Sequence, residues 1–600
     1  MDRFEHEKIP FSVAVLDMDW HLVRDHRVPH AGWTGYTWDE RLFPEPERFR
    51  REMRQRRLRV TLNDHPHGGV HAFESAYEEM AKFLGVDTAD KNAILFDPTN
   101  PKFMEAYFGI LHRRLEDQAC DFWWVDWQQG PHSKIPGFDP LWLLNHFQYL
   151  DSGREGHTPL IFSRYGGPGS HRYPIGFSGD TVVSWASLAF QPEFTATASN
   201  IGYGWWSHDI GGHIRGVRDD ELLARWTQLG VFSPIMRLHS TSSRWMSKEP
   251  WLYSEETRNV MTWYLNYRHR LVPYLYSQSV LGHRNDEPLI QPMYWSYPYT
   301  NQAYEVPNQY YLGRDLLVAP IVQPRDKRTG LASVQAWLPP CGRFVDIITN
   351  TVYDGDRGVT FYRSLKEYPV LAAEGSIIIT DGSVSQHGTA NATVHEILVV
   401  VGRDGATSLI ESPADDSFVS NAFQSEDLSE TKITYTQGDG KLTILSPKPR
   451  KWIVRFFGIP SIPSGLKITA NGTNIDLSTT NSVSARNNIT ALEISLSDDE
   501  AAPSGGTENI TTIELGSKPQ LAVIDHTERL EELIRGFQIE FTLKDKLWAA
   551  LEGWKERPLT AISSLLALGI DTEIVGPLVE LVSADCRTAE ERRSEAIVVR

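Results

Sequence analysis

The first 380 residues alternate short apolar runs with amphipathic helical patterns, and this alternation limits the possible folds more than any other feature of the sequence. Apolar runs separated by helices predict parallel strands joined by helical crossovers. The predicted strands are Phe11–Asp17, Leu58–Leu62, Phe122–Val125, Pro159–Ser163, Val182–Trp185, Gly204–Ser207 and Ser233–Met236. The predicted helices between them include Pro46–Arg57, Phe103–Asp117 and Asp219–Leu229. The fold class is therefore α/β, a (β/α)₈-type barrel that lacks one strand, which we expect to be the first.

The pattern changes after the barrel, and a chain of 600 residues is long enough for three or four domains. Residues 254–281 form a long helical pattern, residues 289–379 are strand-like, and residues 380–520 alternate β-branched and polar residues as a β-sandwich does. The predicted units are a barrel over residues 1–285, a proximal β-sandwich over 286–380, a distal β-rich domain over 381–522 and a helical tail over 523–600.

Charge and cysteine content exclude several classes of protein. The net charge of −18 disfavours a nucleic-acid partner. Three scattered cysteines, Cys120, Cys341 and Cys586, provide neither a disulfide framework nor a zinc site. The sequence implies no cofactor and no metal, and it leaves the oligomeric state open.

The N-terminal residues 1–10 lack the apolar stretch of a secretory signal peptide, and no apolar run is long enough to span a membrane. We therefore predict a cytoplasmic protein without membrane contact, with secretion left open in case the natural N-terminus is longer. Asn391, Asn471, Asn488 and Asn509 begin N-x-Ser/Thr triplets, which also arise by chance in segments rich in Ser and Thr.

The segment 121–130 reads as a buried aromatic strand that ends on the carboxylate of Asp126, close to Trp124 and Trp127. Other predicted strands also end on polar side chains. These side chains are Asp17 and Asp19, Asn63 and Asp64, Asp180, Asp209, Arg237 and His239. An α/β barrel builds its site at the carboxyl ends of its strands, so we expect these groups to converge in one mouth.

Carboxylates, tryptophans and an arginine at one edge fit glycoside hydrolysis better than other chemistries. That reaction needs one ionised carboxylate and one protonated carboxylic acid beside the anomeric carbon. The glycine-rich segment 165–169 lacks the Lys-Ser/Thr of a phosphate loop. His65 and His67 are explained more simply by a packed loop than by a metal pair.

Several ordered motifs over residues 10–380 resemble glycoside hydrolase family 31, the α-glucosidase and α-xylosidase family. The motifs are Leu16-Asp-Met-Asp-Trp20, Trp124-Val-Asp-Trp-Gln-Gln129, Ser163-Arg-Tyr165, Phe177-Ser-Gly-Asp180, His208-Asp-Ile-Gly-Gly212, Pro234-Ile-Met-Arg-Leu-His239, Tyr311-Leu-Gly313, Leu316-Leu-Val-Ala-Pro320 and Trp337-Leu-Pro-Pro340. The resemblance implies a glycosidase that acts on terminal α-linked sugars with retention of configuration, so that its two catalytic carboxyls lie about 5–5.5 Å apart.

The resemblance also implies roles for individual residues. Asp126 is expected to be the nucleophile and Asp180 the general acid and base. The residues expected to bind or surround the sugar are Asp17, Trp124, Arg164, Asp209, Arg237 and His239.

The sequence departs from the family pattern in the expected pocket and at the N-terminus. Gln128 and Gln129 follow the nucleophile segment where Asn-Glu is usual, and His213 replaces a common aromatic residue, which leaves the sugar open. α-Galactoside, N-acetylhexosaminide and lyase chemistry are the alternatives. The β-sandwich that usually precedes the barrel is absent from the chain. The alternative function is therefore a truncated, non-catalytic or partner-dependent carbohydrate-binding protein.

Overall fold

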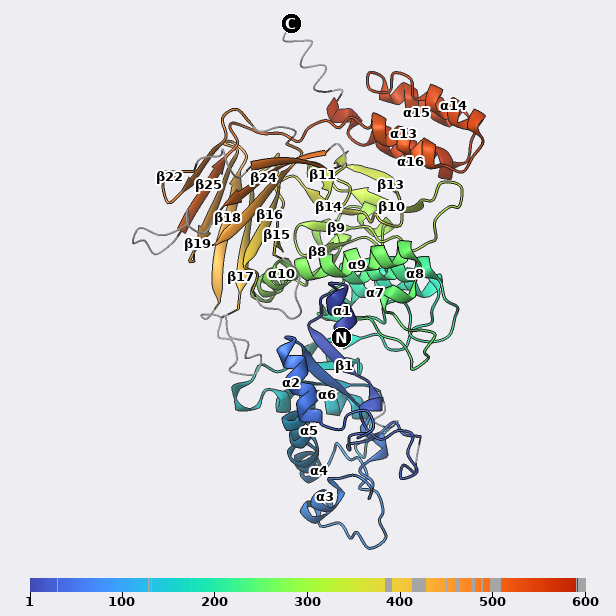
Figure 1. Ribbon diagram of the computed structural model, residues 1–600, viewed down its shortest axis with the longest axis vertical. Helices are drawn as coiled ribbons and strands as arrows, with labels where there is room; N and C mark the ends of the chain where they lie inside the picture. Colours follow the sequence, from blue (N-terminus) through green and yellow to red (C-terminus); the bar gives the residue numbers. More distant parts are fainter. Residues whose placement is uncertain are drawn as a thin grey trace.

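The computed structural model describes residues 1–29, 31–127, 130, 132–173, 175–383, 391–412, 428–448, 450–459, 463–475, 481–486, 489–496, 509–589 and 591. Gln128, Gln129 and Asn488 lie outside these residues. The molecule is elongated, with the N-terminal part of the parallel sheet at one end and the C-terminal helices at the other (Figure 1). Within the described part of the chain, no helix combines the length and apolar content that a membrane crossing requires.

Six parallel strands in sequential order form the N-terminal sheet, which curls as a half-barrel. The strands are β1 (Val13–Leu16), β2 (Arg59–Asp64), β3 (Phe122–Val125), β4 (Ile161–Arg164), β5 (Gly176–Phe177) and β6 (Trp206–Ser207). Their register pairs Leu16 with Leu62, Leu62 with Trp123, and Trp123 with Ile161. Because the strands run in parallel, all of their carboxyl ends lie at one edge.

Two of the predicted strands are wrong, and one strand was not predicted. Residues 233–235 form bends rather than a strand, and Leu238 makes only an isolated parallel bridge to Ile210. Val182 makes a similar single bridge, and helix α7 already begins at Trp185. The unpredicted strand, β5, has only two residues, too few for a periodic sequence signal.

Helices connect the strands and cover the sheet (Figure 1). They are α2 (Pro46–Gln55), α3 (Tyr77–Leu84), α4 (Pro101–Ala106), a π-helical segment (Tyr107–His112), α5 (Arg113–Gln118), α6 (Pro140–Ser152), α7 (Trp185–Ala198) and α8 (Asp220–Val231). A short helix, α1 (Asp2–His6), precedes β1. The side chains of Asn100, Asp139 and Asp219 accept backbone hydrogen bonds at the starts of α4, α6 and α8, which satisfies N–H groups that a helix leaves free.

After α8, the helices α9 (Glu255–Arg270) and α10 (Val272–Asn285) lead into a β-rich region. Its antiparallel sheet has the order β12-β11-β14-β9-β8-β7. These strands are β7 (Ile290–Pro292), β8 (Tyr310–Leu312), β9 (Leu316–Val318), β11 (Arg343–Asp346), β12 (Val352–Asp354) and β14 (Val370–Ala373). A separate hairpin joins β10 (Ala332–Leu338) to β13 (Arg357–Arg363), and the short helices α11 (Met293–Ser296) and α12 (Gln302–Glu305) follow β7.

Two larger sheets follow, and four helices complete the described chain. The first contains β15 (Ile377–Asp381), β16 (Val394–Val400), β20 (Lys451–Phe457), β23 (Asn481–Arg486) and β24 (Ile489–Leu496). The second contains β17 (Gly405–Glu411), β18 (Ser429–Thr436), β19 (Lys441–Ser446), β21 (Lys467–Ala470), β22 (Thr473–Asn474) and β25 (Asn509–Glu514). The helices are α13 (Thr527–Gly536), α14 (Phe541–Ala550), α15 (Pro558–Ala567) and α16 (Thr572–Ser583), so the predicted helical tail is confirmed.

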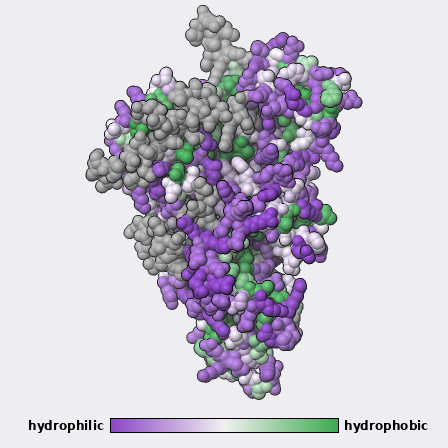
Figure 2. Space-filling model, in the orientation of Figure 1, coloured by the Kyte–Doolittle hydropathy of each residue, from purple (hydrophilic) through white to green (hydrophobic). Residues whose placement is uncertain are grey.

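One buried cluster links the barrel helices to the β-rich region. It contains Trp226 of α8, Tyr264 of α9, Val370 of β14 and residues of both large sheets, including Ile397 and Ile433. A second cluster lies beneath β1–β3 and their helices. The face shown in Figure 2 is mainly hydrophilic, and its apolar side chains form small separate patches, as is ordinary for a folded surface.

Candidate active site

The alternation of side chains along a strand places two polar groups on the interior face of the half-barrel. Trp124, Phe162 and Phe177 share a small buried cluster, whereas Trp123 points into the core beneath β1–β3. Because side chains two residues apart in a strand point to the same face, Asp126 follows the direction of Trp124 and Arg164 that of Phe162. The sequence therefore brings the end of β3 and the end of β4 together above an aromatic floor.

Arg164 contacts two carboxylates at once. Its Nε donates to Oδ1 of Asp126 at 2.8 Å, and its Nη2 donates to Oδ1 of Asp180 at 3.1 Å. A guanidinium is a planar fork, so binding two acceptors fixes both carboxylates relative to each other. Their negative charges raise the pKa of Arg164, although burial alone would lower it.

Asp126 is held in its ionised form by its neighbours. Nε2 of His65 lies 3.5 Å from Oδ2, and the backbone N–H of Trp127 donates to Oδ1 at 2.6 Å. Burial raises the pKa of Asp126, but His65, Arg164 and the Trp127 N–H together outweigh burial and hold the pKa well below its usual range. An ionised carboxylate that is partly shielded from water has the properties of a nucleophile or of a group that stabilises positive charge.

Asp180 has a different environment, because half of its side chain (50%) is exposed. It lies in the loop between β5 and α7 and contacts Arg164 on one side. On the other side, Nε2 of His213 lies 3.8 Å from its Oδ2. Solvent therefore reaches this carboxyl while Arg164 keeps it beside Asp126.

A second aspartate–arginine pair lies deeper, just after β6. Nη2 of Arg237 donates to Oδ1 of Asp209, whose side chain is 1% exposed. Burial raises the pKa of Asp209, and the nearby Arg237 guanidinium and His213 only partly oppose this effect. The Arg237 guanidinium also lies over the rings of Phe162 and Phe177, at 4.9 and 5.1 Å from their centroids. The pair therefore links the end of β6 to the aromatic floor.

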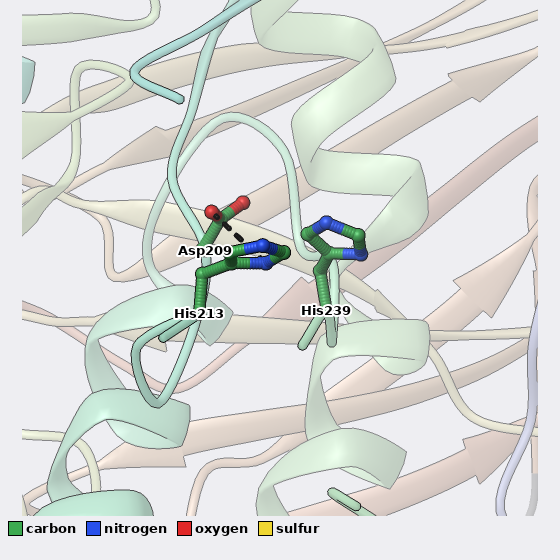
Figure 3. A group of neighbouring side chains, drawn as sticks. All are labelled: Asp209, His213 and His239. Atoms are coloured by element: carbon green, nitrogen blue, oxygen red, sulfur yellow. Dashed lines mark ion pairs between the residues drawn. The ribbon is translucent and has the colours of Figure 1, made fainter. Parts of the chain in front are cut away.

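Asp209, His213 and His239 form a compact group in which the ligand atoms of all three residues lie within 4.8 Å of one another (Figure 3). The two imidazole rings stack with centroids 4.6 Å apart, and His239 stands edge-on to Trp124 at 5.2 Å. Burial and the positive charge of Arg237 lower the pKa of His239 to about 2, so its imidazole is neutral near pH 7. The sequence analysis predicted no metal site and did not identify these three residues as a group.

Asp17 and Trp124 complete the set of predicted residues. Asp17 follows β1 and accepts a hydrogen bond from the backbone N–H of Met18 at 2.7 Å. Burial raises its pKa, and the charge of nearby Asp126 adds to the increase. Trp124 is 1% exposed, so its ring forms the floor beneath the site rather than an open wall. All eight predicted residues therefore lie at or just below the carboxyl edge of the sheet.

Some strand-end groups are structural, and two neighbours of the site were not predicted. Asp64 accepts a hydrogen bond from the Tyr107 hydroxyl inside the core, away from Asp126. His65, the next residue, instead faces Asp126, and its position at a strand end was the available signal. Lys248 donates to the carbonyl oxygen of Gly212 at 2.6 Å, and burial lowers its pKa to about 8. Nothing in its sequence context indicates this position.

Comparison with known proteins identifies the family. The model of the glycosyl hydrolases family 31 TIM-barrel domain matches residues 1–278, and that of the glycosyl hydrolase family 31 C-terminal domain matches residues 286–378. The chain belongs to glycoside hydrolase family 31. The resemblance inferred from the strand-end motifs is thereby confirmed.

Similar family 31 proteins include glucosidases and xylosidases. Neutral alpha-glucosidase C of Mus musculus is 25% identical over 443 residues, which cover 67% of this chain and 47% of that protein. An alpha-xylosidase of Emericella nidulans is 27% identical over 345 residues, covering 54% and 42% respectively. The chain thus spans less than half the length of these two relatives. A Flavobacterium johnsoniae family 31 dextranase structure in complex with glucose has the same fold, with a TM-score of 0.68 at 18% identity, covering 86% of this chain and 68% of that chain.

Proposed function

We propose that the protein is a retaining α-glycoside hydrolase that acts on terminal α-linked sugars. One observation carries this proposal: a single guanidinium, that of Arg164, holds two carboxylates in different environments. Glycoside hydrolysis requires two carboxyls of different character, and retention requires them to lie close together, as a shared guanidinium holds them. The family relatives named glucosidase and xylosidase support the substrate class.

In the proposed reaction, Asp126 attacks the anomeric carbon while Asp180 gives its proton to the leaving glycosidic oxygen. The C–O bond to the leaving group breaks as the bond to Asp126 forms, which gives a covalent glycosyl–enzyme. Asp180, now a carboxylate, then takes a proton from water, and the hydroxide displaces Asp126. Two inversions at the anomeric carbon restore the original configuration.

The other residues position the sugar and stabilise charge. Asp17, Asp209 and His239 offer hydrogen-bonding groups around Asp126, and the buried rings beneath them exclude water. Arg237 keeps Asp209 in place. The positive charge that develops on the sugar ring faces the ionised Asp126, and such preorganised charge is an important contribution to catalysis.

The first test is hydrolysis of p-nitrophenyl α-glucoside, α-xyloside, α-galactoside and α-N-acetylgalactosaminide by the wild type and by Asp126→Ala. Asp90→Ala, which changes an exposed aspartate on the loop after α3, is the matched control. We expect turnover of at least one substrate, lost in Asp126→Ala and kept in Asp90→Ala. Folded wild-type protein that binds sugars but releases no nitrophenol would instead support the non-catalytic, carbohydrate-binding alternative.

A further inference from the structure

The group formed by Asp209, His213 and His239 has donor atoms that the proposed hydrolysis does not require in this combination. Two imidazoles and one carboxylate bring three ligand atoms within 4.8 Å of one another (Figure 3). Two atoms of the group, Oδ2 of Asp209 and Nδ1 of His213, are buried and have no hydrogen-bond partner among the described residues. They lie 3.8 Å apart, too far for a hydrogen bond with each other. Buried polar atoms without partners are costly, so their arrangement points to a ligand.

The surroundings orient these ligand atoms. Arg237 donates to Oδ1 of Asp209 and thereby leaves Oδ2 to face the two histidines. Stacking on His213 and the edge-on contact with Trp124 restrain the ring of His239. Hydrogen bonds such as that from Arg237 to Asp209, which hold a ligating side chain in one orientation, are a regular feature of metal sites.

We propose that Asp209, His213 and His239 form a binding site for Zn²⁺ or a divalent transition metal of similar preference. Imidazole nitrogen and a carboxylate oxygen suit Zn²⁺, whereas Mg²⁺ and Ca²⁺ prefer oxygen ligands alone. Zinc–ligand distances of about 2.0–2.1 Å place tetrahedral ligand atoms about 3.3 Å apart. An imidazole nitrogen binds a metal in the plane of its ring, and the two rings lie only 24° from parallel, so one imidazole must turn out of the stack to complete the site. The fourth position would then be open to water or to an oxygen of a bound molecule.

The site overlaps the place where the proposed function puts the sugar, and this part of the inference rests on that function. Asp209 and His239 cannot bind a metal and a sugar in the same geometry, so Zn²⁺ should compete with the substrate. The charges of Arg237 and Lys248 oppose a cation, whereas the carboxylates of Asp209 and Asp180 favour one. The chain would therefore be a glycosidase inhibited by a transition metal rather than one that needs a metal.

Titration calorimetry of the full chain with Zn²⁺ tests the proposal without measuring activity. His213→Phe removes one ligand and keeps an aromatic ring next to His239, and His239→Gln removes another. His283→Phe, which changes an exposed histidine on α10, controls for surface binding. We expect one Zn²⁺ per wild-type chain, binding at least tenfold weaker in the first two variants, unchanged binding in the control, and no binding of Mg²⁺.

Visible absorption of added Co²⁺ provides a second readout. Bands of nitrogen-bound Co²⁺ should appear with the wild type and disappear in His213→Phe, while circular dichroism reports whether each variant is folded. Equal Zn²⁺ binding by the wild type and both ligand variants would mean an adventitious surface site and would overturn the proposal, as would no binding at all. Failure of the proposed hydrolysis would be distinct, since it would appear as lost turnover with zinc binding intact.

Discussion

The two aspartate–arginine pairs at the carboxyl edge of the sheet differ mainly in how much water reaches them. Arg164 joins Asp126 to the half-exposed Asp180, whereas Arg237 and Asp209 are 7% and 1% exposed. The pKa of Asp126 is lowered by several donors, and that of Asp209 is raised by burial. The same pair of residue types thus holds the proposed nucleophile in one place and a more deeply buried carboxyl beside the proposed sugar site in the other. Changing each pair in turn should separate activity from stability.

The largest expected effect is on the pair formed by Asp126 and Arg164. Asp126→Ala should lower kcat by about 10³-fold or more, because the proposed nucleophile is removed. Its free energy of unfolding should fall as well, because Arg164 and His65 lose the carboxylate whose pKa they lower. Steady-state rates on the best nitrophenyl substrate, with Asp90→Ala as the control, provide the test. A loss of less than tenfold would remove Asp126 from the reaction.

Asp180→Ala should lower kcat by about 10²–10⁴-fold on substrates with a poor leaving group, the usual range for a general acid. The loss should be much smaller with dinitrophenyl glycosides, whose leaving group needs no proton. Added azide should restore part of the rate, since the anion can attack the glycosyl–enzyme without a base. Equal losses on both substrate types would contradict the assignment of Asp180 as the acid.

The buried pair should respond mainly in stability. Arg237→Leu leaves Asp209 as an unpaired buried carboxyl, and loss of one partner of such a pair costs about 3–5 kcal/mol. Arg164→Leu should cost less, about 1–2 kcal/mol, because the Arg164 side chain is 22% exposed and solvent partly screens its pairs. Urea unfolding followed by tryptophan fluorescence compares the two variants. Similar midpoints for both would show that burial does not distinguish the pairs.

The smallest expected effect is a shift in pH dependence. Because its pKa is lowered, Asp126 should stay ionised from pH 7 down to below pH 4, and its stabilising interactions should be lost only as the pH falls further. The rate kcat/KM should therefore show no acidic limb from Asp126 above pH 4. In Arg164→Leu the pKa of Asp126 should rise by about one unit, which corresponds to about 1.4 kcal/mol of lost interaction. The acidic limb of the kcat/KM profile should move upward by the same amount. An acidic limb near pH 5 in the wild type would contradict the strong pairing of Asp126.

The sequence predicted the helices and strands that have a clear hydrophobic periodicity or that end on a polar residue. The strands that end near Asp126 and Arg164 were recognised from apolar runs, and the helix before β3 from its amphipathic pattern. β5 was missed because two residues are too few to show an alternation of apolar and polar side chains. The strand predicted at Ser233–Met236 was wrong because an apolar run alone does not ensure a sheet partner. Whether such a short segment becomes a strand depends on pairing with a strand that is distant in the sequence.

The candidate site was predictable residue by residue, but its chemistry was not. Strand-end motifs located Asp126, Asp180 and Asp209, yet they carry no information on the donors around each carboxyl. Burial raises the pKa of both Asp126 and Asp209, and only at Asp126 do the neighbouring donors outweigh it. Lys248 and the convergence of His213 with His239 depend on loops folding over the sheet. Contacts between distant loops have no signal in local sequence.

The most direct test of the central claim is to trap the covalent intermediate. A 5-fluoro-α-glycosyl fluoride of the sugar that the enzyme prefers should react with the wild type and slow the second step enough for mass spectrometry of its peptides. We predict one sugar attached to the peptide that contains Asp126, and no adduct in Asp126→Ala. A folded, active enzyme that carries the sugar on another residue, or on none, would contradict the assignment of Asp126 as the nucleophile.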